Sequence, residues 1–126
     1  YQKFNNFKLD ISSSYLESYS ESDVLITDFS GTAYTYAFSK NSPVIFFSKY
    51  ANNKLKNYFK KLYYFRDRNK VGYIVNNFSK LEKKLNIIKK NKNIFLGRIK
   101  KLKEKRIQYC GNSLEETKKS IVKLLK

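Results

Sequence analysis

Residues 22–48 read SDVLITDFSGTAYTYAFSKNSPVIFFS. The apolar run at 23–27 is typical of a strand buried on both faces. Turn-forming and cap-forming residues follow at 28–32, and residues 33–39 suit a helix of about two turns. Asn41, Ser42 and Pro43 break that helix before a second apolar run at 44–47. Strand, turn, helix and strand in this order predict a βαβ unit, which builds a parallel sheet.

The turn after the first strand is where we expect a ligand to bind. If Ser30 caps the helix, the amides of Gly31, Thr32 and Ala33 are free and point out of the carboxyl end of the strand. These donors and the positive end of the helix dipole suit an anion, and ligands of open α/β sheets bind at this edge. Gly31 permits close approach, and the hydroxyls of Ser30 and Thr32 add donors. The alternative is that Ser30 is only a cap and Gly31 only a turn residue.

Few side chains of this sequence suit acid–base or metal chemistry. Asp28 stands at the carboxyl end of the first strand, where it can orient a hydroxyl or act as a base, or instead brace the turn by accepting backbone hydrogen bonds. The chain has no His and one Cys, Cys110, so we expect no zinc site, and a Ser-His or Cys-His pair is excluded within it. Neither G-x-x-x-x-G-K-[ST] nor G-x-G-x-x-G is present. We therefore expect no metal and no cofactor.

The rest of the chain extends this unit into one α/β domain, residues 1–126, with a parallel sheet flanked by helices and further helices at the C-terminus. Because it begins with Tyr1, we expect it to be a piece of a longer chain. The lone Cys suits a reducing compartment, and no run of about 18 apolar residues is present. Strands are predicted at 7–11 and 71–75, a charged turn at 66–70, and helices at 15–20, 54–65, 78–90, 94–109 and from 113 onward.

The net charge of +17 suggests a nucleic-acid partner, but its distribution argues against one. Residues 1–50 carry four Lys against five Asp and Glu, whereas residues 51–126 carry 23 basic and five acidic side chains. The βαβ unit is thus outside the basic region. Only four basic residues are Arg, the side chain that bidentate readers of bases and phosphates favour. A basic nucleic-acid-binding module with stacking Tyr and Phe side chains stays the alternative function.

The helix at 94–109 is the most basic segment of the chain. It could hold the protein on an anionic membrane surface, where each Lys contributes about 1 kcal/mol. The alternative is a solvated face whose apolar stripe, formed by Phe95, Ile99 and Leu102, packs on the sheet. The predicted basic patch consists of Lys100, Lys101, Lys103, Lys105 and Arg106.

Several blocks of this sequence resemble the CDP-glycerol glycerophosphotransferases, the teichoic-acid polymerase and primase group, and related surface-glycan transferases. Residues 22–30, SDVLITDFS, are similar to the family signature aDvlITDySS, and residues 43–47, PVIFF, to the strand kPiiff that follows it. Residues 72–75 with 78–81, and residues 111–113, resemble the later segments G.iv.n..eL and dGnss in the same order. Gly31 stands where a second Ser is common, and Thr35 where an acidic residue is frequent.

The resemblance implies the C-terminal, Rossmann-like half of a GT-B transferase, which holds a nucleotide-activated donor. Ser30 and Thr32 would contact the diphosphate of a CDP-linked or UDP-linked donor, with Asp28 and Gly31 beside it. The acceptor would be a growing surface polymer such as teichoic acid or capsule, bound by an N-terminal acceptor domain of the same chain. The family's His-Pro segment would precede these residues, so this segment alone is expected to be inactive. Together with the basic helix and the charge distribution described above, this leads us to expect a cytoplasmic enzyme, peripheral on the inner face of the cell membrane, with no nucleic-acid partner.

Overall fold

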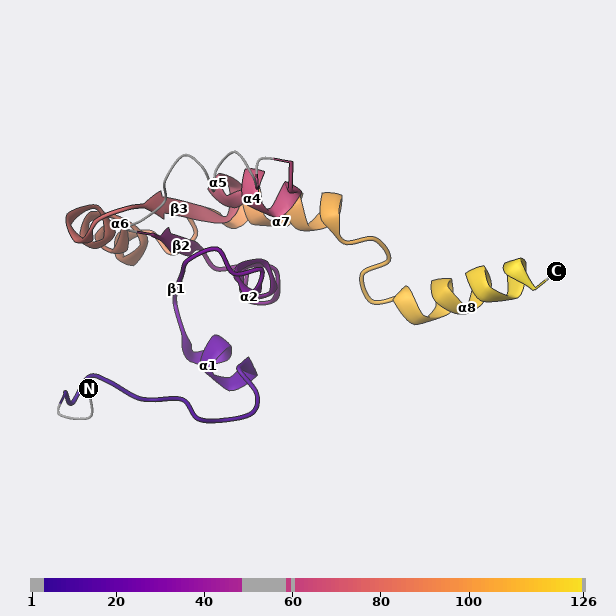
Figure 1. The fold of residues 1–126 in the computed structure, drawn as a ribbon, viewed down its shortest axis with the longest axis horizontal. Helices are drawn as coiled ribbons and strands as arrows, with labels where there is room; N and C mark the ends of the chain where they lie inside the picture. Colours follow the sequence, from indigo (N-terminus) through magenta and orange to yellow (C-terminus); the bar gives the residue numbers. More distant parts are fainter. Residues whose placement is uncertain (1–3, 49–58, 60, 126) are drawn as a thin grey trace.

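The computed structural model describes residues 4–48, 59 and 61–125 (Figure 1). Its first part consists of helix α1 (Leu16–Glu21), strand β1 (Leu25–Thr27), helix α2 (Thr32–Lys40) and strand β2 (Val44–Phe47). The second part consists of α4 (Tyr63–Arg66), α5 (Arg68–Val71), β3 (Gly72–Val75), α6 (Phe78–Lys90), α7 (Leu96–Arg106) and α8 (Ser113–Leu124). Of the predicted helix at 54–65, the structure describes only residues 59 and 61–65, and α4 begins at the third last of these, Tyr63.

β1, α2 and β2 form the βαβ unit that the sequence predicts. β1 and β2 are parallel, with Leu25 beside Val44 and Thr27 beside Phe46. β3 lies parallel on the other side of β2, so the strand order is β1-β2-β3. The described chain is therefore α/β, with a three-stranded parallel sheet flanked by helices (Figure 1).

The prediction that both strands of the unit are buried on two faces is right for β2 and wrong for β1. Val44 and Ile45 of β2 have no exposed surface. In β1, by contrast, Ile26 is 46% exposed, and Leu25 and Thr27 are half-buried. The reason is position, because β2 has a strand on each side whereas β1 is an edge of the described sheet. An apolar run alone does not distinguish a central strand from an edge strand.

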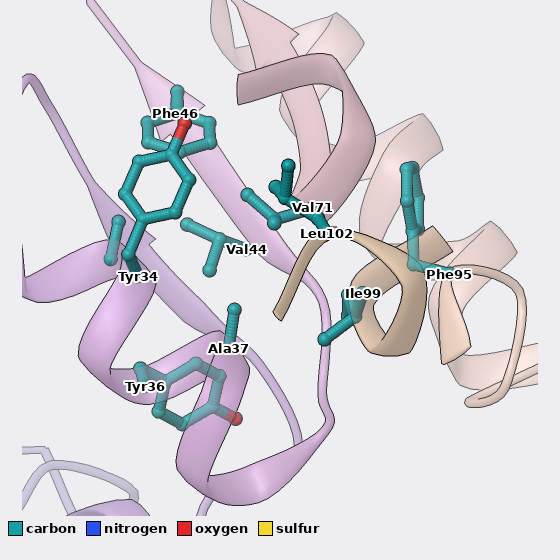
Figure 2. Close-up of a cluster of buried hydrophobic side chains, with 10 residues drawn as sticks. Tyr34, Tyr36, Ala37, Val44, Phe46, Val71, Phe95, Ile99 and Leu102 are labelled. Carbon is teal, nitrogen blue, oxygen red and sulfur yellow. The ribbon is translucent and has the colours of Figure 1, made fainter. Parts of the chain in front are cut away.

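Alternate side chains of β2 enter two apolar clusters, one on each face of the sheet. On one face Val44 and Phe46 pack with side chains of α2, α5 and α7, which point toward one another in Figure 2. On the other face Ile45 packs with Val75 of β3 and Ile88 of α6. Burial on both faces fixes the register of β2, since a slip of one residue would exchange the two sets.

β3 begins at Gly72, which lies in very close contact with the backbone of β2. A Cβ added to Gly72 would be 1.6 Å from the carbonyl oxygen of Val44 and 2.6 Å from its carbonyl carbon. Val44 is also the register partner of Gly72. The Gly72 backbone is fully extended, with a φ of 178°. Glycine is therefore needed here for space and not for an unusual torsion angle.

Residues 7–11 do not form the predicted strand. Leu9 and Ile11 are 61% and 88% exposed, so no described segment covers their apolar side chains. The carboxylate of Asp10 instead accepts hydrogen bonds from the hydroxyls of Ser12 and Ser18 and from the Ser12 amide. These bonds lower the pKa of Asp10 to about 2. Such local side-chain bonds compete with strand pairing, and here they hold the segment in a turn leading into α1.

α8 stands away from the sheet at the C-terminal end of the described chain (Figure 1). It has no buried residue, and Leu114 and Leu124 are 66% and 85% exposed. Its ion pairs are internal, with Lys118 3.0 Å from Glu115 and Lys119 2.7 Å from Glu116. Within residues 4–48, 59 and 61–125, no helix has the length and apolar character needed to cross a membrane.

Candidate anion-binding site at the end of β1

Ser30 joins the end of β1 to the start of α2, directly before the N-cap residue Gly31, and accepts hydrogen bonds from the first helical amides. Its Oγ accepts a hydrogen bond from the Thr32 amide at 3.2 Å and lies 2.6 Å from Thr32 Oγ1. Its carbonyl accepts a hydrogen bond from the Ala33 amide at 3.3 Å. The prediction that the amides of Thr32 and Ala33 are free is therefore wrong, because Ser30 itself satisfies both. The amide of Gly31 makes no hydrogen bond to the described residues.

Gly31 leaves open space in front of α2. Its backbone is ordinary helix, with φ −63° and ψ −24°. A Cβ added at Gly31 would meet nothing within 4 Å. Sterically, any residue fits this position, and alanine would favour the helix by up to about 1 kcal/mol. Gly31 is thus not required by the fold, whereas a longer side chain would fill the space that a ligand of this helix end needs.

The four side chains predicted to bind the donor lie together in one short turn. Asp28, Gly31 and Thr32 are exposed, and Ser30 is half-buried. Asp28 has no hydrogen bond to the described residues. The alternative prediction, in which Asp28 braces the turn by accepting backbone hydrogen bonds, is therefore wrong for this part of the chain. The turn is instead anchored by Phe29, whose ring stacks on that of Phe65 at a centroid distance of 5.9 Å and an angle of 20°.

Phe29 belongs to a group that also contains Phe46, Phe65 and Arg68, which we call the Arg68 cluster. The guanidinium carbon of Arg68 lies 3.6 Å from the ring centre of Phe65. It lies 5.4 Å from the ring centre of Phe29 and 5.6 Å from that of Phe46. Because Phe29 stands between Asp28 and Ser30, this cluster places a cation beside the candidate turn.

Arg68 is 8% exposed and has no carboxylate partner. Its Nε donates a hydrogen bond to the carbonyl oxygen of Phe65 at 3.0 Å. All ten Asp and Glu residues lie in the described part of the chain, and none forms an ion pair with Arg68 there. Burial lowers the pKa of Arg68, as expected for a desolvated cation without a counter-charge. An arginine nevertheless keeps its charge in proteins.

Asp67, the neighbour of Arg68, is a structural carboxylate. Its side chain is 6% exposed and lies 2.6 Å from Lys70 Nζ and 2.5 Å from Arg106 Nη2. Burial raises the pKa of Asp67, but the hydrogen bonds from Lys70 and Arg106 outweigh it and leave the pKa below its usual value. Arg106 also lies over the ring of Tyr63, at 4.6 Å. Asp67 thereby ties α5 to the end of α7.

The sequence interpretation missed the roles of Asp67 and Arg68, which it placed in a charged turn. The available signal was their position shortly after the three aromatic residues at 63–65 and shortly before a strand. Charged side chains between an aromatic segment and a strand can become partly buried when both segments pack into the core. Their partners, Phe29 and Arg106, are remote in sequence, so no local pattern identifies them.

A hollow of about 180 Å³ lies at the opposite, amino end of β1. Val24, Leu85 and Ile88 give it an apolar wall. The exposed pair of Asp23 and Lys92, 2.9 Å apart, lines it as well. Ligands of parallel α/β sheets bind at the carboxyl ends of the strands, so this hollow lies at the wrong edge for the predicted site.

The predicted basic patch on α7 is divided by the fold. Lys103 donates to the carbonyl of Phe38 at 2.9 Å, and Arg106 is bound to Asp67, so both face inward. Lys100, Lys101 and Lys105 are exposed. The apolar stripe of this segment is buried against the cluster that contains Val44 and Phe46 of β2, as predicted for a helix that packs on the sheet. Its members are Phe95, Ile99 and Leu102.

A family model agrees with the likeness to transferases seen in the sequence. The model of the LIC12162 family transferase matches residues 1–91, which is more than half of the chain. The chain belongs to this family. No curated protein and no solved structure matches it. For this LIC12162 family transferase, the matched residues include the turn at 28–32, the whole sheet and the Arg68 cluster. α7 and α8 lie beyond the match.

Proposed function

We propose that the turn at 28–32 binds the diphosphate of a nucleotide-activated donor, CDP-linked or UDP-linked. Residues 1–126 then form a single Rossmann-like donor-binding domain of a GT-B enzyme. The transferred group is a glycerol phosphate or a sugar, and the product is a bacterial surface polymer of the teichoic-acid or capsule type. Asp28, Ser30, Gly31 and Thr32 line the diphosphate site.

The observation that carries this proposal is the open space at Gly31 in front of α2. A diphosphate there meets the free Gly31 amide, the exposed Thr32 hydroxyl and the positive end of a nine-residue helix. The bonds from the Thr32 and Ala33 amides to Ser30 are long, at 3.2 and 3.3 Å, so a charged ligand can compete for these donors. As the bond to the departing nucleotide breaks, negative charge grows on its phosphate oxygens, and these donors stabilise it.

Membership of a transferase family favours this function over a basic nucleic-acid-binding module. We propose further that the acceptor is a growing surface polymer held by an N-terminal acceptor domain of the same chain. The enzyme then works in the cytoplasm at the inner face of the membrane. The exposed amines of Lys100, Lys101 and Lys105 support contact with anionic lipid, since the other two members of the predicted patch are engaged within the domain.

Replacing Gly31 with leucine should separate binding from folding. We expect Gly31→Leu to change the free energy of unfolding little, because the position is open and its backbone is already in a conformation that leucine adopts. The same side chain should weaken binding of CDP and UDP by at least about tenfold, equivalent to about 1.4 kcal/mol, because it occupies the ligand's place. Isothermal titration calorimetry measures the affinity, and urea unfolding measures the stability.

Gly97→Leu is the matched control. Gly97 lies in the first turn of a helix, and a Cβ added there, as at Gly31, meets nothing within 4 Å. It is in α7, away from the turn, so this variant should bind as the native protein does. Equal affinities of the native protein and Gly31→Leu would refute the site, and so would the absence of binding by the native protein at millimolar nucleotide.

A further inference from the structure

Arg68 is a nearly buried cation whose guanidinium group forms no ion pair with any Asp or Glu of the chain. Its exposed fraction is 8%, and the only hydrogen bond that its side chain makes to the described residues uses Nε, which donates to the carbonyl of Phe65. None of the ten Asp and Glu side chains, all in the described part of the chain, forms an ion pair with Arg68. Asp67, its neighbour in sequence, forms ion pairs with Lys70 and Arg106 instead. A buried charge is normally paired, so this arrangement calls for a counter-ion.

The terminal nitrogens of Arg68 are available to such a counter-ion. In the described part of the chain, no buried side-chain nitrogen or oxygen lacks a hydrogen bond. The Nη atoms of Arg68 have no hydrogen bond to described residues. Because no unpaired side-chain nitrogen is fully buried, these atoms must be accessible to solvent. Three phenyl rings, those of Phe29, Phe46 and Phe65, hold the planar group in place. A guanidinium fixed in this way loses little conformational entropy when it forms two parallel bonds to a phosphate.

The Arg68 cluster also connects this cation to the candidate turn. Phe29, 5.4 Å from the guanidinium carbon, lies between Asp28 and Ser30 in sequence. Tyr34, in the first turn of α2, donates its hydroxyl to the carbonyl of Tyr64, next to Phe65. The cation and the start of α2 are therefore held together by ring contacts and by one hydrogen bond between α2 and α4.

We propose that Arg68 is the second anchor of the ligand's phosphate or diphosphate group, opposite the Gly31 amide and the Thr32 hydroxyl. This inference rests on the proposed function and adds a residue that supplies charge to it. α2 then contributes neutral donors, and Arg68 contributes a fixed planar cation. The site thereby selects for phosphate-bearing ligands over neutral nucleosides, because only the former neutralise the buried charge.

The test compares two arginines that lie on aromatic rings. In Arg68→Met the aliphatic side chain keeps contact with the phenyl rings and removes the charge. Arg98→Met is the control, since Arg98 lies 4.5 Å from the Phe95 ring but is exposed and belongs to α7. We expect Arg68→Met to weaken binding of inorganic pyrophosphate and of CDP at least tenfold, with stability unchanged or raised. Arg98→Met should match the native protein, and Arg68→Lys should recover part of the affinity, because lysine lacks the planar fork.

The outcomes distinguish this inference from the proposed function. If Gly31→Leu no longer binds pyrophosphate and Arg68→Met binds it with an affinity within twofold of the native protein's, the proposed role of Arg68 is wrong. The proposed site at the turn is then still supported. If the native protein binds neither pyrophosphate nor nucleotide, both the proposed function and the proposed role of Arg68 are wrong. Should Arg68→Met fail to fold, the arginine Nε–H signals of the native protein are followed by nuclear magnetic resonance during addition of pyrophosphate. A shift of the Arg68 signal supports the proposal, and unchanged arginine signals overturn it.

Discussion

Gly72→Ala should lower the free energy of unfolding by about 3 kcal/mol or more, which is a large part of the usual 5–15 kcal/mol for a domain. The new methyl group would lie 1.6 Å from the Val44 carbonyl oxygen and 2.9 Å from the Val44 nitrogen, both backbone atoms of the central strand. A flexible side chain can move aside, but Val44 is fixed by burial on both sides of β2. The substitution must therefore force β3 away from β2. Urea unfolding followed by tyrosine fluorescence measures the loss.

Gly97→Ala is the control for the Gly72 variant. It adds the same methyl group in open space within α7 and should be neutral or stabilising by up to about 1 kcal/mol. A Gly72→Ala protein whose free energy of unfolding falls by less than about 1 kcal/mol would contradict the close strand contact, since a clash with backbone atoms is not relieved by a side-chain movement.

Asp67→Asn should destabilise the protein by about 3 kcal/mol, because it leaves two cations without their counter-charge. The Asp67 side chain is 6% exposed and that of Arg106 is 27% exposed, so solvent screens this pair poorly. The variant keeps the size of the side chain, so the loss reports charge and not packing. Asp23→Asn is the control. Its pair with Lys92 has both side chains more than 60% exposed, and pairs of that kind contribute at most about 1 kcal/mol.

The contribution of Asp67 should also depend on pH in a defined direction. The folded state has the lower pKa, so the stabilisation is fully present above the unfolded-state pKa of about 3.9 and disappears as the pH falls through the folded-state value. Native protein and Asp67→Asn should therefore converge in stability below about pH 4. A difference that stays constant from pH 7 to pH 3 would show that the carboxylate charge is not the cause.

The sequence predicted those parts of the fold whose causes are local. The βαβ unit follows from two apolar runs separated by a turn and a helix, and α2, β2 and β3 form where the patterns placed them. The strand at 7–11 was wrong because alternation needs a partner, and Asp10 finds hydroxyl donors close by instead. The burial of β1 was overestimated, since an edge strand and a central strand carry similar residues.

The candidate site was predictable in position but not in detail. Cap chemistry located the turn at 28–32, yet it did not show that Ser30 would engage the amides of Thr32 and Ala33. Arg68 lies 38 residues after Ser30 in the chain, so only the folded arrangement brings it beside Phe29. Which cation of a lysine-rich chain becomes buried depends on tertiary packing, and local sequence does not encode that directly.

The separation of α8 from the sheet affects how the melting of this protein is to be read. A twelve-residue helix that buries none of its residues against the described part of the chain is marginal in water and loses structure gradually on heating. Far-ultraviolet circular dichroism sums this gradual loss with the cooperative transition of the core, so one fitted midpoint would describe neither process. Tyr34 and Tyr36 of α2 are buried in the core, and α8 has no aromatic residue, so the near-ultraviolet signal does not report α8. The difference between the two signals isolates the helix–coil equilibrium of α8.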